Sequence, residues 1–264
     1  MKRLNDILSN ITTIAVAHDA NPVIHHIGYD SRAMKPGSMF FALRGLTHDG
    51  HSYIGQAVAN GAIAVVCETL PDTTEKHVTY ITVKNSRLSI AQAAAKYYDH
   101  PSTRIKLIGI TGTNGKTTIA TLLHQLFTGM GYKAGLISTI RYITGTDTFD
   151  ASHTTPDAIR INALLHEMAA EGCTYCFMEV SSHAIKQHRI EGLVFTGGIF
   201  TNLTHDHLDY HTSFDDYRDT KKQFFDQLPE HAWALISGED RNASYIVQNS
   251  EAKIFTYAVK GMAD

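Results

Sequence analysis

A phosphate-loop motif constrains the fold of this chain more than any other feature of its sequence. Residues 109–118 read Gly-Ile-Thr-Gly-Thr-Asn-Gly-Lys-Thr-Thr and directly follow the largely apolar run 105–108. When a strand breaks into a glycine-rich turn that opens a helix, backbone N–H groups point at a bound anion, and Lys116 adds a positive charge. The hydroxyl of Thr117 is then placed to bind Mg²⁺. The motif predicts a nucleotide-phosphate site formed by Gly112, Thr113, Asn114, Gly115, Lys116, Thr117 and Thr118.

The loop is a variant of the common pattern. That pattern has a glycine five residues before Gly115, where this chain has Ile110, and the glycine of this chain is Gly112 instead. The alternative interpretation is a glycine turn before an ordinary helix. Because Lys-Thr-Thr stands where a phosphate loop carries it, the sequence favours the phosphate loop.

Length and composition are typical of a globular protein with two domains. The chain has 264 residues, and its 23 basic and 26 acidic residues give a net charge of −3. Such a charge gives no indication of nucleic-acid binding. We see no signal peptide and no apolar stretch of membrane-spanning length, so we expect no membrane insertion. Three cysteines, an odd number, then favour reduced thiols and a cytoplasmic location.

Cys173 and Cys176 form a C-x-x-C pair, a spacing also found in redox and zinc sites. Such sites have the pair at a helix start or beside a second cluster, whereas this pair leads into residues 177–180, which are typical of a strand. Alternation along a strand would place the two thiols on opposite faces. We therefore interpret both as structural cysteines.

Strand and helix patterns alternate in two stretches, which indicates an α/β fold with domains at 1–100 and 101–264. In the first stretch the sequence predicts strands at 39–43, 62–67 and 78–83 and helices at 53–60 and 88–98. In the second it predicts strands at 105–110, 133–137, 175–180, 197–201 and 232–237 and helices at 116–130, 157–171 and 214–228. Strands separated by helices form a mainly parallel sheet, with ligands beyond the carboxyl ends of the strands.

Two further groups of polar residues follow strands at that edge. Glu179 ends an apolar strand, and a carboxylate near a phosphate loop is the expected second contact of Mg²⁺. The alternative is a Glu that caps a helix or forms a salt bridge. The segment 201–211, Thr-Asn-Leu-Thr-His-Asp-His-Leu-Asp-Tyr-His, is dense in ligand-type side chains. A zinc site and a solvated structural loop are the alternatives there.

These motifs resemble those of the Mur ligases, the ATP-dependent amide ligases of peptidoglycan synthesis. The resemblance rests on Thr-Gly-Thr-Asn-Gly-Lys-Thr-Thr (111–118), Met-Glu-Val-Ser-Ser-His (178–183) and segment 201–211. Within the family, the chain is most similar to members that add the third residue of the stem peptide. That similarity is carried by segments 29–32, 36–42, 48–54, 153–157 and 187–189.

The resemblance implies a small N-terminal α/β substrate domain and a P-loop ATPase domain. It implies ATP and Mg²⁺ as cofactors, and as substrates UDP-N-acetylmuramoyl-L-alanyl-D-glutamate and an amino acid, meso-diaminopimelate or L-lysine, which the sequence does not distinguish. The γ-phosphoryl group would pass to the D-glutamyl carboxylate, and an amine would attack the acyl phosphate. The alternatives are another Mur-type ligase, such as the folylpolyglutamate or D-Ala-D-Ala-adding enzymes, and a nucleotide-binding module without ligase activity.

The same resemblance assigns roles to individual residues. It implies that Lys116, Glu179, His207 and Lys221 are catalytic, with Thr117, Glu179 and His207 as metal ligands. The implied substrate-binding residues are Ser31, His48, Asp49, Gly50, His51, His153, Thr154, Thr155, Ser181, Gln187 and Arg189.

Lys221 stands where the family carries a carbamylated lysine. Carbamylation would turn its cation into a carboxylate-like anion that supports a metal. The alternative is that Lys221 and Lys222 are both solvated surface charges.

The chain departs from the family at its C-terminal end. Family members have a third domain that binds the incoming amino acid, and we find no such domain after the apolar run 253–259. We therefore expect an incomplete central domain, a monomer, and a fragment that binds its ligands but is doubtful as a catalyst alone.

Overall fold

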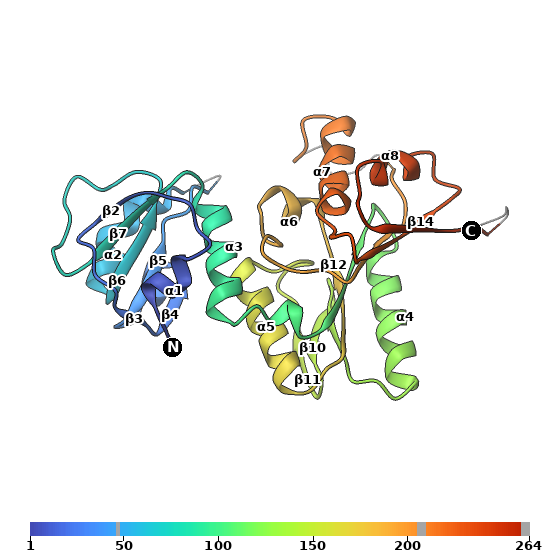
Figure 1. Ribbon diagram of the computed structural model, residues 1–264, viewed down its shortest axis with the longest axis horizontal. Helices are drawn as coiled ribbons and strands as arrows, with labels where there is room; N and C mark the ends of the chain where they lie inside the picture. The colour runs from blue at the N-terminus through green and yellow to red at the C-terminus, as the bar shows by residue number, and fades with distance from the viewer. Residues whose placement is uncertain (46–47, 205–209, 260–264) are drawn as a thin grey trace. The chain divides into compact units, whose positions relative to one another are not determined.

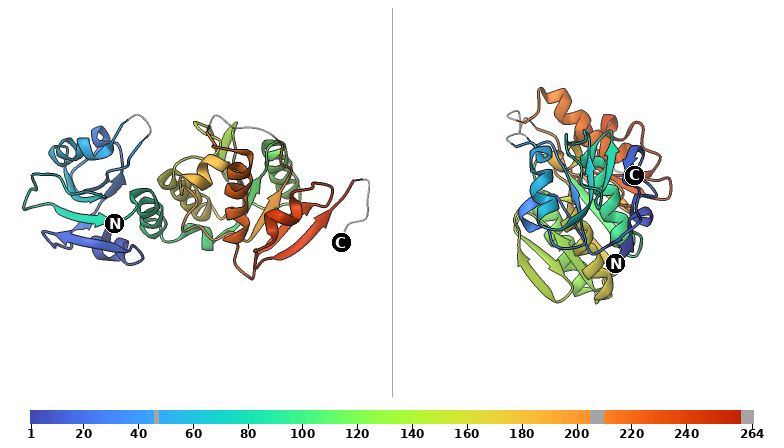
Figure 2. Two further views of the ribbon diagram at one scale, coloured as in Figure 1. Left: turned by 90° about the horizontal axis from the view of Figure 1, so that it is seen from above. Right: turned by 90° about the vertical axis from the view of Figure 1, so that its left-hand side faces the viewer.

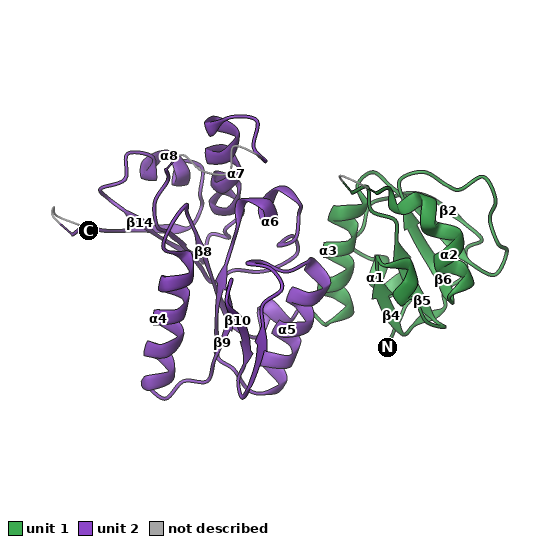
Figure 3. Ribbon diagram, turned by 180° about the vertical axis from the view of Figure 1, so that it is seen from behind, with its two compact units in different colours: residues 1–99 green, residues 100–264 purple. Residues whose placement is uncertain are grey.

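The computed structural model describes residues 1–45, 48–204 and 210–259. The chain divides into two compact units, Met1–Asp99 and His100–Asp264 (Figure 3). Each unit has its own sheet and its own hydrophobic core. Within the described part of the chain, every helix is too short or too polar to span a bilayer.

The first unit is built on a five-stranded sheet with the order β2-β7-β6-β5-β4. Its strands are β2 (Thr13–Ala17), β4 (His26–Gly28), β5 (Ser38–Phe41), β6 (Ala62–Cys67) and β7 (Thr79–Val83), and a small second sheet pairs β1 (Lys2–Arg3) with β3 (Val23–Ile24). Only β2 runs antiparallel in the larger sheet. The helices are α1 (Leu4–Leu8), α2 (Ile54–Ala59) and α3 (Ser86–Tyr97). Asn85 begins α3, because its side chain accepts hydrogen bonds from the N–H groups of Arg87 and Leu88.

The second unit is built on an eight-stranded sheet with the order β11-β10-β9-β12-β8-β13-β14-β15. Its strands are β8 (Lys106–Thr111), β9 (Ala134–Ile137), β10 (Arg141–Thr144), β11 (Asp147–Asp150), β12 (Tyr175–Glu179), β13 (Gly197–Phe200), β14 (Trp233–Ser237) and β15 (Lys253–Tyr257). Its helices are α4 (Lys116–Gly129), α5 (Ala158–Ala170), α6 (Ser182–Lys186), α7 (Phe214–Asp226) and α8 (Ala243–Val247). Strands β9, β12, β13, β14 and β15 run parallel to β8. Strand β10 is antiparallel to both of its neighbours, β9 and β11.

Helices cover both faces of this sheet (Figures 1 and 2). Leu107 belongs to the core that includes residues of α5 and α7, whereas Ile108 and Ile110 belong to the core under α4. Successive residues of β8 therefore face opposite layers, as the pleat of a strand requires. This arrangement brings the turn after β8 to the ligand edge of the sheet.

The predicted parallel α/β architecture is confirmed, although the sequence predicted no strand at β4 or β15 and missed several other short or exposed elements. The sequence missed the β10–β11 hairpin because β11, with the sequence Asp-Thr-Phe-Asp, is exposed along its whole length and lacks an apolar face. It also missed the edge strand β2, which is largely exposed, and the short helices α6 and α8.

Cys173 and Cys176 are free, buried thiols, as their structural interpretation requires. The argument from alternation was wrong, because Cys173 lies before β12 begins and both residues pack in the same core. Burial raises the pKa of the Cys176 thiol, which keeps it protonated and unreactive.

Candidate functional site

The turn after β8 has the backbone of a phosphate loop. Gly112 and Gly115 have φ angles of +147° and +86°, which side chains of L-residues rarely adopt. At Gly112 a Cβ would also lie 2.0 Å from Thr201 Oγ1, so this glycine lets β8 and the strand-end segment 201–204 approach closely. Helix α4 then begins at Lys116, with its N-terminal N–H groups beside the turn.

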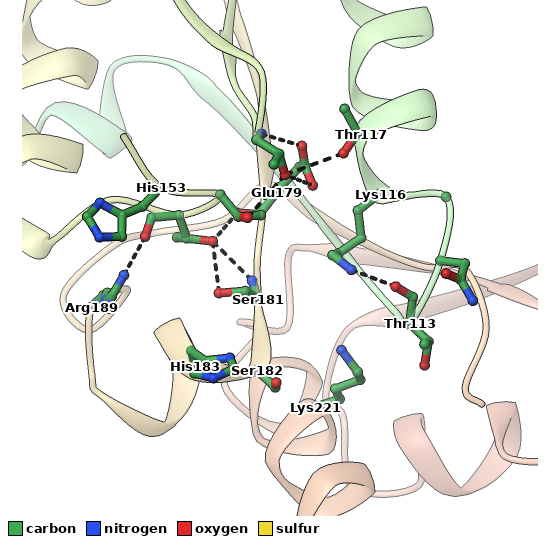
Figure 4. A pocket seen from close by; sticks show the side chains of 15 residues that line it. Thr113, Lys116, Thr117, His153, Glu179, Ser181, Ser182, His183, Arg189 and Lys221 are labelled. Atoms are coloured by element: carbon green, nitrogen blue, oxygen red, sulfur yellow. Dashed lines mark hydrogen bonds between the residues drawn. The ribbon is translucent and has the colours of Figure 1, made fainter. Parts of the chain in front are cut away.

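A cavity of ≈ 500 Å³ lies at the carboxyl ends of β8 and β12 (Figure 4). The predicted site residues that line it are Thr113, Asn114, Gly115, Lys116, Thr117, His153, Thr154, Thr155, Glu179, Ser181, Arg189 and Lys221. Thr139, Ser182 and His183 also line it, and the sequence analysis had assigned them no binding role. Gly112, Thr118 and Gln187 are not among the described lining residues. His207 lies outside the described residues, as do the other residues of 205–209 in the segment to which the zinc alternative applies. The described residues contain no cluster of three His, Cys, Asp or Glu side chains that could hold a metal ion.

Two lysines converge on one carbonyl oxygen of the loop. Lys116 Nζ donates to Gly112 O at 2.9 Å and to Thr113 O at 2.8 Å, and Lys221 Nζ donates to the same Gly112 O at 2.9 Å. Lys221 is only 1% exposed and lies 4.6 Å from the ring centroid of Tyr217. Two cations held this close together make the cavity attractive to an anion.

The alternative that Lys221 and Lys222 are solvated surface charges is wrong, because both are buried. Lys222 binds both carboxylate oxygens of Asp226, at 2.6 and 2.7 Å, one turn along α7. Lys221 is the one of the pair that lines the cavity.

Glu179 lies fully buried at the end of β12. Its Oε1 accepts a hydrogen bond from the backbone N–H of Thr139 at 2.7 Å, and its Oε2 accepts one from the Thr139 hydroxyl at 3.2 Å. The Thr139 hydroxyl also lies 3.5 Å from Thr117 Oγ1 on α4. Carboxylate and hydroxyl oxygens from three segments thus gather on one side of the cavity, and this donor set suits Mg²⁺.

A second polar group of the cavity lining is formed by Thr155 and Arg189. Thr155 donates its hydroxyl proton to Glu179 O at 2.8 Å, and Arg189 Nη1 donates to Thr155 O at 2.6 Å. Gln187 Oε1 accepts hydrogen bonds from Nε and Nη2 of Arg189 at 3.1 and 2.8 Å. Although Gln187 does not itself line the cavity, it orients the guanidinium that does. A fixed guanidinium beside hydroxyl groups suits a carboxylate or sugar oxygen.

The described part of segment 201–211 holds the phosphate loop in place. Thr201 Oγ1 donates to Asn114 O at 2.7 Å, and the N–H of Asn114 donates to Asn202 Oδ1 at 3.1 Å. Thr113 Oγ1 lies 3.2 Å from Tyr217 OH on α7. These contacts fix the loop from two neighbouring elements, which the spacing of the motifs along the chain could not show.

The first unit has a cavity of its own, of ≈ 550 Å³. Three of the predicted residues line it, Ser31, His48 and Gly50. Asp49 and His51 are not among the lining residues of the described chain. Instead, His51 Nδ1 lies 2.6 Å from Asp49 Oδ1, and its Nε2 accepts a hydrogen bond from the N–H of Glu68 at 2.9 Å. Tyr29, Arg32, Tyr53, Gln56 and Arg87 also line this cavity, and the sequence had not marked them as binding residues.

Comparison with known proteins decides the family. The sequence profile of the Mur ligase middle domain matches residues 110–264, and that of the Mur ligase family catalytic domain matches residues 23–113. The chain belongs to the Mur ligase family.

Individual Mur ligases match nearly all of the chain. UDP-N-acetylmuramoyl-L-alanyl-D-glutamate--2,6-diaminopimelate ligase of Cytophaga hutchinsonii is 48% identical over 263 residues, 99% of this chain and 54% of that protein. The ligase of the same name from Phocaeicola vulgatus is 48% identical over 262 residues, with the same two shares. A solved structure of a ligase with this name has a TM-score of 0.77 at 26% identity, over 91% of this chain and 50% of that chain. The chain spans about half the length of the curated relatives it matches.

The site residues that sequence reasoning missed in this Mur ligase chain share one property. Thr139, Ser182 and His183 each follow a strand of the parallel sheet within a few residues. Ser182 and His183 belong to the motif 178–183, but the motif alone gave them no role. Thr139 carried one usable signal: it follows β9, whose carboxyl end lies next to that of β12.

Proposed function

We propose that this chain supplies the ATP site and the muramoyl-dipeptide site of a ligase that adds the third amino acid to UDP-N-acetylmuramoyl-L-alanyl-D-glutamate. The observation that carries the proposal is the composition of the second unit's cavity. It holds phosphate-loop Lys116, the buried carboxylate of Glu179 and the guanidinium of Arg189 within ≈ 500 Å³. A nucleotide phosphate and a substrate carboxylate can therefore meet in one cavity, as the formation of an acyl phosphate requires.

The cavity fits a nucleotide with its magnesium ion. Glu179, Thr117 and Thr139 offer only oxygen ligands, and the fully buried carboxylate of Glu179 has a negative charge to neutralise. When bound there, Mg²⁺ would neutralise the charge that develops on the phosphate oxygens. Family membership supports the use of ATP. His207 as a further metal ligand stays a prediction.

The protein's own residues would bind and align the nucleotide phosphate and the substrate carboxylate by their positions and charges. Lys116 now donates to two loop carbonyls, and it can exchange these acceptors for phosphate oxygens without moving its backbone. Arg189, oriented by Gln187, can hold the carboxylate of the peptide near the phosphate loop. Neither residue needs to accept or release a proton. Catalysis would then consist of alignment and electrostatic stabilisation.

Lys221 is proposed to be carbamylated in the ligand-bound protein. In this reaction the neutral amine attacks CO₂, a C–N bond forms, and the nitrogen releases a proton. The resulting anion would offset the positive charge of Lys116, whose Nζ shares the Gly112 carbonyl with Lys221. A ¹³C NMR signal from ¹³CO₂ bound to the unaltered chain, absent in Lys221→Met and retained in Lys222→Met, would support the assignment.

The cavity of the first unit is proposed to bind the uridine diphosphate end of the substrate. Aromatic rings from Tyr29 and Tyr53 suit a base, and the guanidinium groups of Arg32 and Arg87 suit phosphate oxygens. Ser31 supplies a buried hydroxyl at the same cavity.

Phosphate release with ATP, the muramoyl dipeptide and a candidate amino acid tests the proposed ligation. Because the curated relatives are named for 2,6-diaminopimelate, we propose this amino acid ahead of L-lysine. Calorimetric binding of ATP and the dipeptide tests the two sites in this chain itself. A chain that binds ATP but does not bind the dipeptide would instead favour a nucleotide-binding module without ligase activity. A monomeric state and a cytoplasmic location stay predictions.

A further inference from the structure

Three hydrogen-bonded side chains lie beside the cavity of the second unit and are not used by the proposed function. Ser182 Oγ lies 3.0 Å from His211 Nε2, and His211 Nδ1 lies 3.3 Å from Asp216 Oδ2. Ser182 lines the cavity, and Ser182 and His211 are 1% and 2% exposed. The three residues come from the start of α6, the end of segment 201–211 and the first turn of α7. Figure 4 shows Ser182 between His183 and Lys221.

Asp216 determines which nitrogen of His211 carries the proton. Its Oδ2 accepts hydrogen bonds from Lys186 Nζ at 2.6 Å and from the backbone N–H of Thr212 at 3.0 Å. The hydrogen bond from Lys186 lowers the pKa of Asp216 to about 2, so the carboxylate is ionised at neutral pH and can only accept. Burial lowers the pKa of His211, which favours the neutral ring. A neutral ring beside this acceptor carries its proton on Nδ1 and leaves Nε2 as an acceptor.

The polarity of the Ser182 hydroxyl follows from this tautomer. Because His211 Nε2 accepts, Ser182 donates its single proton to the ring, and its oxygen offers lone pairs to other groups. We propose that Ser182 is a substrate-binding residue that accepts a hydrogen bond from an amide N–H of the bound peptide, and that His211 and Asp216 are positioning residues that fix this polarity. The inference rests on the proposed function, because its ligand is the muramoyl dipeptide.

The amide N–H of the D-glutamyl residue is the donor that the cavity favours. The D-glutamyl residue bears the carboxylate that must approach Lys116, and its own amide is the peptide N–H closest to that carboxylate. Lys116 and Arg189 can hold anionic groups, but neither can accept a hydrogen bond. Ser182 adds the acceptor, directly after Ser181 in the chain.

Two ligands that differ at this N–H test the inference. One is UDP-N-acetylmuramoyl-L-alanyl-D-glutamate, and the other is its depsipeptide, in which an ester oxygen replaces the D-glutamyl N–H. We expect calorimetry on the unaltered chain to give about tenfold weaker binding of the depsipeptide, since a buried acceptor loses its partner. In Ser182→Ala the ratio of the two affinities should fall to about one.

His211→Phe tests the positioning role, because it keeps a ring of similar size and the Ser182 hydroxyl. That hydroxyl could then turn its proton toward the ester oxygen, so the ratio should fall below about threefold. Ser38→Ala is the matched control: it removes a comparable contact, between Ser38 Oγ and His26 Nδ1 at 3.4 Å, and neither residue lines either of the two cavities. The tenfold ratio should remain in this control. A purely structural role of His211 would lower both affinities equally and leave the ratio unchanged.

The outcomes separate this inference from the proposed function. If Ser182→Ala binds both ligands with the same ratio as the unaltered chain, or if the unaltered chain does not distinguish them, the inference is wrong and the dipeptide site stands. If the unaltered chain binds neither ligand, the proposed function fails and the inference fails with it. Should Ser182→Ala not fold, as judged by its melting curve, an unchanged ratio in His211→Phe overturns the inference by itself.

Discussion

The two cavities of the chain hold their charged groups in different ways. In the first unit, the side chain of Arg32 is 79% exposed and pairs with Asp30, two residues before it. In the second unit, Glu179 is fully buried and Lys221 is 1% exposed. Their hydrogen bonds reach residues 40 and 109 positions away in the sequence, Thr139 and Gly112. Local pairs on the surface thus contrast with buried charges held by distant segments.

This contrast teaches where binding and stability are coupled. An exposed ion pair contributes little to folding, so charged residues of the first cavity can serve a ligand alone. A buried charge must be hydrogen-bonded to be tolerated, so the partners of Glu179 and Lys221 stabilise the fold and shape the site together. Variants in the second cavity should therefore change stability as well as affinity.

The largest effect is expected for Lys116→Ala, which should weaken ATP binding at least about 100-fold, because charged hydrogen bonds to phosphate are lost. Lys116 is only half-buried, so the melting temperature should change little. Calorimetry with ATP measures the loss, and Lys106→Ala, an exposed lysine at the start of β8, is the control. Unchanged ATP affinity in Lys116→Ala would refute the phosphate-loop assignment.

Glu179→Gln should cost stability and remove the effect of magnesium. The amide NH₂ group would face one of the two Thr139 donors, so we expect a loss of about 1–3 kcal/mol in the free energy of unfolding. Urea denaturation measures the free energy of unfolding. Calorimetry with and without Mg²⁺ measures the effect of magnesium on ATP binding. An unchanged free energy of unfolding in this variant would contradict the claim that the hydrogen bonds of buried Glu179 stabilise the fold.

Ser31→Ala and His51→Ala should separate binding from folding in the first unit. Ser31 lines the cavity, so its loss should weaken UDP binding about fivefold and spare ATP. His51 is bonded to Asp49 and to the N–H of Glu68, so its loss should lower the free energy of unfolding by about 1–2 kcal/mol. Equal losses of UDP affinity in the two variants, without destabilisation of His51→Ala, would restore His51 as a direct substrate contact.

The smallest effect concerns acid stability of the second unit. The pKa of Asp216 is lowered to about 2 by its hydrogen bond from Lys186, so its contribution is present above pH 4 and is lost as the pH falls toward 2. With allowance for solvent screening, this contribution is on the order of 1 kcal/mol. Asp216→Asn should flatten the fall in stability between pH 4 and 2, and denaturation curves at several pH values would show it. An equally steep fall in the variant would assign the acid sensitivity to other carboxyl groups.

The sequence predicted the phosphate loop and its surroundings because their signals are local. A few neighbouring residues are enough to predict the role of Gly112, Gly115 and Lys116. The same holds for Glu179, which ends an apolar strand. Buried parallel strands such as β12 and β13 have strong apolar runs, so the core of the sheet could be predicted as well.

The rest depended on contacts between distant segments. Thr139 becomes part of the site only because β9 lies beside β12, and His211 only because α6 and α7 bring Ser182 and Asp216 to its two nitrogens. Thr139 lies in no motif, and segment 201–211, which ends in His211, gave no indication that this ring contacts Ser182 and Asp216. At His51 a motif suggested a ligand contact, which stays a prediction, and the structure adds hydrogen bonds of the ring with Asp49 and with the N–H of Glu68.

Hydrogen–deuterium exchange with one ligand at a time tests most directly whether the two cavities bind different ligands. ATP with Mg²⁺ is expected to protect residues 111–118 and leave the first unit unchanged. UDP alone is expected to protect residues 29–32 and 50–53 and leave the phosphate loop unchanged. Protection of the phosphate loop by UDP, or an unprotected loop in saturating ATP, would contradict the assignment of nucleotide phosphates to the second cavity and of the uridine end to the first.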